Sequence, residues 1–400
     1  KLFLDGVQVG STYTDSNNYL AATNRPVIGS GGYSSANTVT GYISNLRITK
    51  GVGVYTGNFT VPTSPLALTQ SSGTNISAIT TGQTLFLLNG TTYSNNNTFI
   101  DSSTNNLTVT RNGTPTQAPI SPYYGTNYSV LFNGSSDYLR LSSSAMALTN
   151  NNFTIELWAY INVLPTSDNW PSSWSSTGVL VCVGTASTGD GFNFILGSTQ
   201  IFAQNNDTKY GSATHGMSIN QWYHLACTRS GTTLYFFVNG TQKGTATLSG
   251  NVGTGAYTFI GSETGEGAYI NGYISNLRVI NGTALYTSSF TPPTTALTAV
   301  SGTSLLACQS NKFIDNSNYG YTITTFSAPK ISAFQPFSLT YASSTYGGSG
   351  YFNGSTDYLS IAYNSVLNYS SSAPFTFECW FYPTVGSTDN SHIEIGRAHV

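Results

Sequence analysis

The amino-acid sequence predicts an all-β protein made of tandem antiparallel β-sandwich jelly rolls. Short apolar runs, such as residues 179–183 and 234–238, are bounded by clusters of Gly, Asn, Asp and Ser, which is the pattern of strands and turns. No amphipathic stretch with helix-capping signals stands out. Blocks of sequence also recur at a spacing of whole-domain size.

The strands are expected to be joined by tight hairpins. The run at 234–238 leads directly into Asn239-Gly240, a two-residue signal for a type I′ turn. Asp5-Gly6 holds the equivalent place after Phe3-Leu4 near the start of the chain. Many short strands joined by Gly- and Asn-containing turns favour a sandwich or jelly roll over an α/β fold.

The recurring blocks give the length of the repeating unit. The phrase Gly-Tyr-Ile-Ser-Asn-Leu-Arg at 41–47 returns at 272–278, an offset of 231 residues (272 minus 41). The phrase Phe-Asn-Gly-Ser at 132–135 returns at 352–355, an offset of 220 residues (352 minus 132). Such a period is too long for a solenoid repeat or propeller blade and has the size of a domain.

The order of these blocks predicts how the chain is divided. Residues 1–70 are expected to be the C-terminal part of one unit, 80–300 a complete unit, and 303–394 the N-terminal part of a third. Residues 395–400 resemble the translation of a common sequencing-adapter read. The chain is therefore interpreted as an open-ended piece from environmental sequencing, with an artefactual end.

The composition excludes several classes of protein. Charged residues make up only 7% of the chain, against roughly 25% in an ordinary soluble domain. Because 39% of residues are hydrophobic and 13% aromatic, the sequence is not that of a disordered chain. The 13 Lys and Arg residues are scattered, so no nucleic-acid partner is expected, and no apolar run is long enough for membrane insertion.

The four cysteines leave two alternatives open. Cys182, Cys227, Cys308 and Cys379 form no Cys-x-x-Cys pair and no zinc-type cluster. Cys182 and Cys227 are close enough in sequence to pair inside one unit. The other interpretation is that all four are buried as small hydrophobic side chains.

The set of recurring phrases is similar to the laminin-G-like branch of the concanavalin A-like lectin/glucanase superfamily. The phrases are Phe-Asn-Gly-x-x-Asp-Tyr-Leu at 132–139, Phe-Thr-x-Glu-x-Trp at 153–158, Gln-Trp-Tyr-His-Leu-Ala at 221–226 and Gly-Tyr-Ile-Ser-Asn-Leu-Arg at 272–278. The Ser-, Thr- and Asn-rich composition further resembles that of virion proteins of marine bacteriophages. The resemblance implies a jelly-roll fold, neighbouring laminin-G-like domains, and a place outside cells or on a virion surface.

The residues do not predict an enzyme. The glucanase branch would need two carboxylates about 5 Å apart, and on a strand these would occupy alternate positions. The nearest acidic pair, Glu263 and Glu266, is spaced by three and interrupted by glycine. Glu156 and Glu378 recur as part of a repeated strand and have no acidic partner nearby, so a structural role is expected for them.

The resemblance also raises the question of calcium, since laminin-G-like domains often bind one ion through Asp and backbone carbonyls. The metal-ligand candidates by position are Asp137 and Asp357, in the two copies of Phe-Asn-Gly-x-x-Asp. The alternative is that each carboxylate caps its own tight turn. No other cofactor is expected.

A candidate ligand site lies in two polar loops of the complete unit. Trp158, Trp222 and Trp380 fall in strand-like phrases and are expected in the core, whereas Trp170 and Trp174 fall in a Pro- and Ser-rich loop. A loop Trp beside hydrogen-bonding side chains can act as a stacking platform for a sugar, and the alternative is a ring folded onto the sandwich edge. The predicted ligand-binding residues are Asp168, Asn169, Trp170, Trp174, Asn206, Asp207 and Tyr210.

Three functions follow from this reading. The first is a non-catalytic carbohydrate-binding or adhesion module, whose partner is a glycan or cell-surface polysaccharide and whose repetition adds avidity. The second is a structural spacer or decoration domain of a virion appendage. The third, a glycoside hydrolase, is disfavoured by the missing carboxylate pair.

Overall fold

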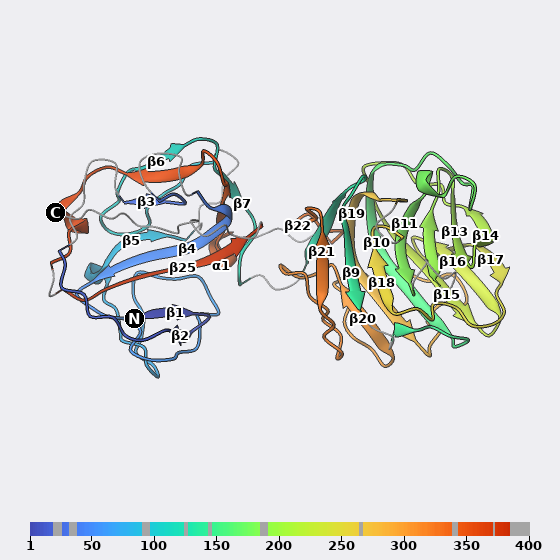
Figure 1. Ribbon diagram of the computed structural model, residues 1–400, viewed down its shortest axis with the longest axis horizontal. Helices are drawn as coiled ribbons and strands as arrows, with labels where there is room; N and C mark the ends of the chain where they lie inside the picture. Colours follow the sequence, from blue (N-terminus) through green and yellow to red (C-terminus); the bar gives the residue numbers. More distant parts are fainter. Residues whose placement is uncertain are drawn as a thin grey trace. The chain divides into compact units, whose positions relative to one another are not determined.

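The computed structural model describes the whole chain except residues 19–25, 32–37, 90–96, 124–126, 143–145, 185–190, 264–266, 338–342, 371–372 and 385–400. The regular structure of the described part is dominated by antiparallel strands (Figure 1). Its described helical elements are one short α-helix, α1 (Ser343–Tyr346), and the 3-10 helices η1 (Thr81–Gln83), η3 (Trp174–Ser176) and η5 (Ser365–Leu367). The predicted all-β fold of antiparallel sheets is therefore confirmed. The predicted artefactual segment 395–400 lies outside the described residues.

The chain forms two compact units. Unit 1 comprises Lys1–Tyr124 and Thr340–Val400, and unit 2 comprises Gly125–Leu339. Unit 2 is thus inserted into the sequence of unit 1. In the part of the chain that the structure describes, no helix is long and apolar enough to span a membrane.

Unit 2 contains two sheets. In the first, the strand order is β17-β16-β15-β10-β19-β8-β22, and β20 also pairs with β19. Its described strands are β8 (Ser129–Asn133), β10 (Phe153–Val163), β15 (Trp222–Ser230), β16 (Thr233–Val238), β17 (Thr241–Thr247), β19 (Asn271–Asn281), β20 (Thr303–Ala307) and β22 (Lys330–Ser332). We call this the eight-stranded sheet.

The second sheet of unit 2 has the order β14-β13-β12-β11-β18-β9-β21, and we call it the seven-stranded sheet. Its described strands are β9 (Tyr138–Ser142), β11 (Gly178–Val183), β12 (Phe192–Leu196), β13 (Gln200–Asn205), β14 (Thr208–Thr214), β18 (Tyr257–Ile260) and β21 (Ile323–Phe326). Each sheet mixes strands that are distant in sequence, as expected for a jelly roll.

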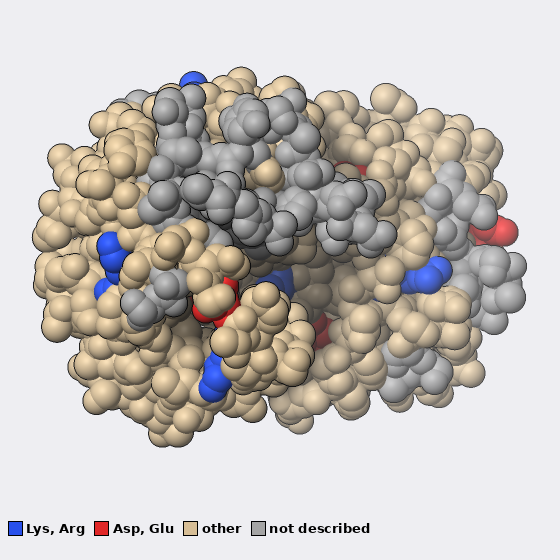
Figure 2. All heavy atoms as spheres, turned by 60° about the vertical axis from the view of Figure 1, so that its left-hand side comes forward, with Lys and Arg blue, Asp and Glu red and all other residues tan. Residues whose placement is uncertain are grey.

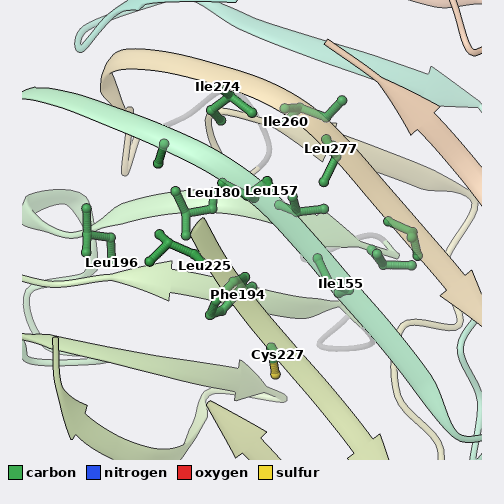
Figure 3. Close-up of a cluster of buried hydrophobic side chains, with 14 of the residues drawn as sticks. Ile155, Leu157, Leu180, Phe194, Leu196, Leu225, Cys227, Ile260, Ile274 and Leu277 are labelled. Carbon is green, nitrogen blue, oxygen red and sulfur yellow. The ribbon is translucent and has the colours of Figure 1, made fainter. Parts of the chain in front are cut away.

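The core of unit 2 lies between its two sheets. Successive side chains of a strand point to opposite faces, so every second residue of each strand contributes to the core. Leu157 of β10 and Leu225 of β15 come from one sheet, and Leu180 of β11 and Phe194 of β12 come from the other; all four are fully buried in one cluster (Figure 3). The apolar run at 179–183 falls in β11, which is buried on both of its faces.

The hairpin signals form the expected turns. Asn239 and Gly240 both have positive φ, 48° and 72°, and connect β16 to β17. A side chain at Gly240 would not fit, because a Cβ there would lie 1.9 Å from the carbonyl oxygen of Phe290. Asn206 and Asp207 also have positive φ, 49° and 58°, and connect β13 to β14.

Unit 1 is a smaller assembly of the same kinds of strand. Its largest sheet has the order β25-β4-β23-β7, with β5 pairing β4; a second sheet has the order β3-β24-β6, and β1 pairs with β2. Its described strands are β1 (Leu2–Leu4), β2 (Val7–Val9), β3 (Val27–Ile28), β4 (Thr40–Lys50), β5 (Thr84–Leu88), β6 (Val109–Asn112), β7 (Thr116–Ala118), β23 (Ser349–Asn353), β24 (Tyr358–Ile361) and β25 (Phe375–Pro383).

The unit boundaries differ from those expected from the repeats, which placed a complete unit at 80–300 between fragments at 1–70 and 303–394. Strands β20, β21 and β22 all lie beyond residue 300 but pair with β19, β9 and β8 of unit 2. Likewise β5 pairs with β4, while β6 and β7 pair with β24 and β23 of unit 1. The repeated phrases mark strand interiors and do not say which sheet these closing strands join.

All four cysteines are free. Cys182 faces away from the core of unit 2, whereas Cys227 belongs to that core, so the seven-stranded sheet separates the two thiols. Burial raises the pKa of the Cys227 thiol well above its usual value. Of the two alternatives, the structure therefore shows unpaired cysteines, three of them buried.

Candidate functional site

The predicted tryptophans lie against the outer face of the seven-stranded sheet, on the side away from the core. A single row of residues in register crosses this face from one edge strand to the other. Its members, in order, are Lys209, Gln204, Asn193, Cys182, Phe259, Arg140 and Thr324. The middle of the row is buried, whereas Lys209, Arg140 and Thr324 towards its two ends keep part of their surface exposed.

A second apolar cluster covers the middle of this face. It consists of buried side chains that include Val179, Ile195, Phe202 and Phe259. Four half-buried aromatic residues pack around it: Tyr138, Trp170, Trp174 and Tyr257. We call these four the aromatic rim. The outer face thus combines an apolar floor with partly exposed rings.

The loop that carries the two tryptophans is fastened by Asp168. Its carboxylate accepts hydrogen bonds from the Ser198 hydroxyl (2.8 Å), the Thr199 amide and hydroxyl (3.0 and 2.7 Å) and the Gln200 amide (3.1 Å). Gly197 makes room for this contact, because a Cβ there would lie 2.1 Å from Asp168 Oδ1. Asp168 therefore acts as an anchor between the loop and the β12–β13 turn.

The two tryptophans pack on each other and on the sheet. Their ring centroids are 6.2 Å apart in an edge-to-face arrangement. Trp174 lies against Gly267, where a Cβ would come within 2.7 Å of its ring. The Trp170 Nε1 atom is buried and has no hydrogen-bond partner among the described residues. Both rings keep part of their surface exposed.

A polar network runs beside the aromatic rim. The Asn193 side-chain amide donates to Gln204 Oε1 (2.6 Å) and Glu263 Oε1 (2.7 Å). Asn193 is fully buried, and its Oδ1 atom has no partner in the described part of the chain.

At the end of the row, Lys209 donates to the Asp168 carbonyl (2.7 Å) and to Gln200 Oε1 (2.9 Å). Its ammonium lies 4.1 Å from the Phe202 ring centroid. The sequence reading missed Asn193, Gln204 and Lys209, because only their register places them on one face.

The electrostatics of this corner are set by opposing effects. Burial would raise the pKa of Asp168, but the hydrogen bonds from Thr199 and Ser198 outweigh it and the pKa lies below its usual value. Burial lowers the pKa of Lys209, while the charge of Asp168 partly offsets this effect. Asp168 is thus a carboxylate at neutral pH whose lone pairs are largely occupied by the protein.

The other predicted ligand residues are not gathered beside the tryptophans. Asn169 is exposed next to Trp170, and its amide donates to the Ser167 hydroxyl. Asn206 and Asp207 are exposed at the tip of the β13–β14 hairpin. Tyr210 packs against the core between the sheets, so its ring lies on the opposite side of the sheet from Lys209. The structure therefore brings together Asp168, Trp170 and Trp174 out of the predicted set.

The two candidate calcium ligands cap loops. Asp137 accepts from the amides of Asn133 (3.1 Å) and Ala328 (2.9 Å). Asp357 accepts from the amides of Asn353 (3.1 Å) and Thr114 (2.7 Å). Calcium takes six to eight oxygen ligands, usually with more than one carboxylate. Both carboxylates are thus engaged by backbone amides, as expected for residues that cap their loops. The described residues hold no group of three or more His, Cys, Asp or Glu side chains placed to bind a metal ion.

Glu156 and Glu378 each form an ion-pair network with little or no exposure to solvent. Glu156 accepts from Arg278 Nε (2.9 Å) and Nη2 (2.6 Å), and from the Tyr286 hydroxyl (2.9 Å); His224 Nε2 lies 3.2 Å from its Oε2. Burial would raise the pKa of Glu156, but the His224 hydrogen bond and the Arg278 charge bring it below its usual value. In unit 1, Arg47 and Tyr55 bind Glu378 in the same way.

Residues 133–286, which lie inside unit 2, match the Laminin_G_3 family model, described as the Concanavalin A-like lectin/glucanases superfamily. With its antiparallel strands in facing sheets, unit 2 is a concanavalin A-like sandwich. None of the curated proteins compared with the chain matches it.

Three solved structures are similar to part of the chain. A candidate carbohydrate-binding protein from Bacteroides ovatus is 13% identical, with a TM-score of 0.38; the match covers 54% of this chain and 62% of that protein. A heptameric SAP-like pentraxin from Limulus polyphemus is 16% identical over 54% of this chain and 98% of its own, with a TM-score of 0.37. Domain 4 of AbnA, an extracellular GH43 arabinanase of Geobacillus stearothermophilus solved with arabinotriose, is 20% identical, with a TM-score of 0.30. The match covers 48% of this chain and 91% of that domain.

Proposed function

We propose that the chain is a non-catalytic carbohydrate-binding segment of an extracellular or virion-surface protein. The aromatic rim carries this proposal: four half-buried rings surround one apolar face of a concanavalin A-like sandwich. Aromatic faces stack on the apolar side of sugar rings, and tyrosine and tryptophan add a polar edge. The partner is then a glycan or cell-surface polysaccharide.

The sparse charge of the chain supports a sugar partner. Lys, Arg, Asp and Glu together make up 7% of residues, and Figure 2 shows only isolated charged side chains on the face in view. The Ser-, Thr- and Asn-rich surface can exchange hydrogen bonds with hydroxyl groups. The virion-surface setting is proposed from the same composition.

The state of the buried glutamates supports a non-catalytic role. A retaining glycosidase needs two carboxyl groups about 5 Å apart and open to substrate. Both oxygens of Glu156 are occupied by Arg278, Tyr286 and His224, and its side chain is fully buried. Glu263 is tied to Asn193.

A structural spacer is the second candidate function. The observation that favours it is the packing of Trp170 and Trp174, which lie on the sheet and on each other and so close an apolar surface. In that case the tryptophans stabilise unit 2 and bind no ligand.

A glycan array probed with the full chain separates the two functions. We expect binding by the chain, and a loss of roughly two- to tenfold for Trp170→Leu or Trp174→Leu, since an aromatic contact contributes about 0.5–1.5 kcal/mol. Trp222→Leu is the matched control, because Trp222 is also half-buried but lies on the eight-stranded sheet against Tyr160 and Phe334.

The melting temperature of each variant shows whether the fold is kept. The carbohydrate site is supported if glycan binding is weaker in Trp170→Leu or Trp174→Leu but unchanged in Trp222→Leu. No binding by the intact chain, together with a large loss of stability in the two loop variants, would establish the spacer role instead.

A further inference from the structure

Arg140 lies on the same outer face as the tryptophans, one strand from the end of the row that is opposite Lys209. It belongs to β9, next to the edge strand β21. Its guanidinium lies 4.6 Å from the ring centroid of Phe326 on β21 and 5.0 Å from that of Tyr257 on β18. The group is therefore held between two aromatic rings from the strands on either side, and all three side chains are half-buried.

A further ring extends this arrangement. Tyr138 stacks on Phe326 with centroids 4.4 Å apart and the ring planes within 5° of parallel. Tyr138, Phe326, Arg140 and Tyr257 thus form one continuous group, which we call the arginine stack. Two of its members, Tyr138 and Tyr257, also belong to the aromatic rim.

The guanidinium of Arg140 is orientated but not neutralised. Its described contacts are the two ring contacts, and no described carboxylate or carbonyl binds it. The buried arginines of unit 2 differ: Arg278 binds Glu156, and Arg229 donates to the carbonyls of Gly231, Thr149 and Leu248. Five N–H donors of Arg140 therefore remain for another molecule.

Unit 1 lacks this arrangement at the corresponding positions. The repeat places Ser360 where unit 2 has Arg140, and Asn112 pairs with Tyr358 where Phe326 pairs with Tyr138. At these described positions of unit 1, both the basic group and its flanking ring are therefore replaced by small polar side chains. The arginine stack is a property of one unit and not of the fold.

The planar guanidinium can bind a carboxylate in a bidentate manner, because two of its parallel N–H groups donate to the two carboxylate oxygens. A long polyanion would require several cations, and Arg140 stands alone in the stack. We infer that the arginine stack binds the carboxylate of an acidic sugar, whose ring rests on Tyr257 or Tyr138. This inference rests on the proposed carbohydrate function and adds the chemical class of the ligand.

The test measures binding of the full chain to immobilised polygalacturonate, which carries a carboxylate on each sugar. Fully methyl-esterified polygalacturonate is the matched ligand without the charge. We expect esterification, or Arg140→Met, to weaken binding roughly ten- to a hundredfold, the range of a charge-assisted hydrogen bond. Methionine keeps an apolar stem between the rings, and Arg140→Lys is expected to restore binding only in part because it lacks the planar fork.

Arg111→Met is the control variant, because Arg111 is exposed on β6 of unit 1 and has no described ring contact. Binding to polygalacturonate that is unchanged in Arg140→Met would overturn the inference, as would equal binding to the methyl ester. Arg140-dependent binding to dextran sulfate but not to polygalacturonate would also overturn it. Binding of neutral glycans alone would reject this inference and leave the proposed function standing, whereas no glycan binding would reject both.

Discussion

At the scale of single residues, the same ion-pair network is built twice. Arg278 and Glu156 join β19 to β10, and Arg47 and Glu378 join β4 to β25. Separating buried charges leaves one of them without a partner in a medium that solvates it poorly. The network therefore favours one pairing of the central strands over alternatives, and it lies at corresponding positions of the repeated phrases.

Replacing Glu156 with Gln should destabilise unit 2 by about 3–5 kcal/mol, because the buried Arg278 charge loses its partner. Glu378→Gln is the matched variant, and we expect a smaller loss because the Glu378 side chain is 12% exposed whereas that of Glu156 is fully buried. Urea unfolding of the full chain measures both. Equal losses of unfolding free energy in the two variants would show that burial of the glutamate does not set the size of the effect.

The same carboxylate predicts how stability depends on pH. Folding lowers the pKa of Glu156, so its stabilisation is complete above the unfolded-state pKa of about 4.3 and is lost as the pH falls from there through the folded-state pKa. Glu156→Gln should flatten the stability curve in this acid range, as measured by urea unfolding at a series of pH values. If the variant loses stability at acid pH as steeply as the unaltered chain does, other groups control the acid dependence.

At the scale of elements, strand pairing depends on a few glycines in tight turns. Gly240 closes the β16–β17 hairpin with a positive φ and meets the Phe290 carbonyl. Gly6 occupies the corresponding turn between β1 and β2, where a Cβ would lie 2.2 Å from the carbonyl oxygen of Phe59. Both turns therefore need glycine for its backbone conformation and for its lack of a side chain.

Gly240→Ala should destabilise unit 2 by more than Gly250→Ala. Both glycines have positive φ, 72° and 82°, so each variant has the strain of an L-residue in the left-handed region, about 1–2 kcal/mol. Gly250 has open space around its Cβ position, whereas Gly240 faces a carbonyl at 1.9 Å. The difference in melting temperature between the two variants measures the effect of the clash with the Phe290 carbonyl. Equal melting temperatures would show that this clash does not destabilise unit 2.

The hairpins and the repeated strands could be predicted from the sequence, because they depend on local turn chemistry and on alternation. The candidate site was predicted only in part. Trp170, Trp174 and Asp168 stood out as unusual residues in a polar loop, and they do lie together. Asn193 and Arg140 gave no signal, since each is an ordinary strand residue until the register places it on the outer face.

At the scale of the whole molecule, unit 1 depends on both halves of its sequence. Strand β4 is paired along its length with β25, and β23 also pairs with β4. The inserted unit 2 contains its own closing strands β20, β21 and β22. The two units therefore differ in which deletions they should tolerate.

Truncation after Leu339 should unfold unit 1 and leave unit 2 folded, because β4 loses two of its partners whereas unit 2 keeps all of its described strands. Hydrogen exchange measured by mass spectrometry should show loss of protection in β4 and β5 and retained protection in β10 and β19. The fragment 125–339 is the control and should fold by itself. Protection of β4 in the truncated chain would contradict this assignment of strands.

The sequence by itself determined the all-β class, the strand and turn positions and the sparse charge, because alternation, Asn-Gly turns and composition act locally along the chain. Only the tertiary structure decided which strands close which sandwich, and that residues 303–332 complete unit 2. It also decided that Arg140 lies between Tyr257 and Phe326, far apart in sequence. The physical reason is that register across a sheet is set by pairing between distant strands, and no local pattern records it.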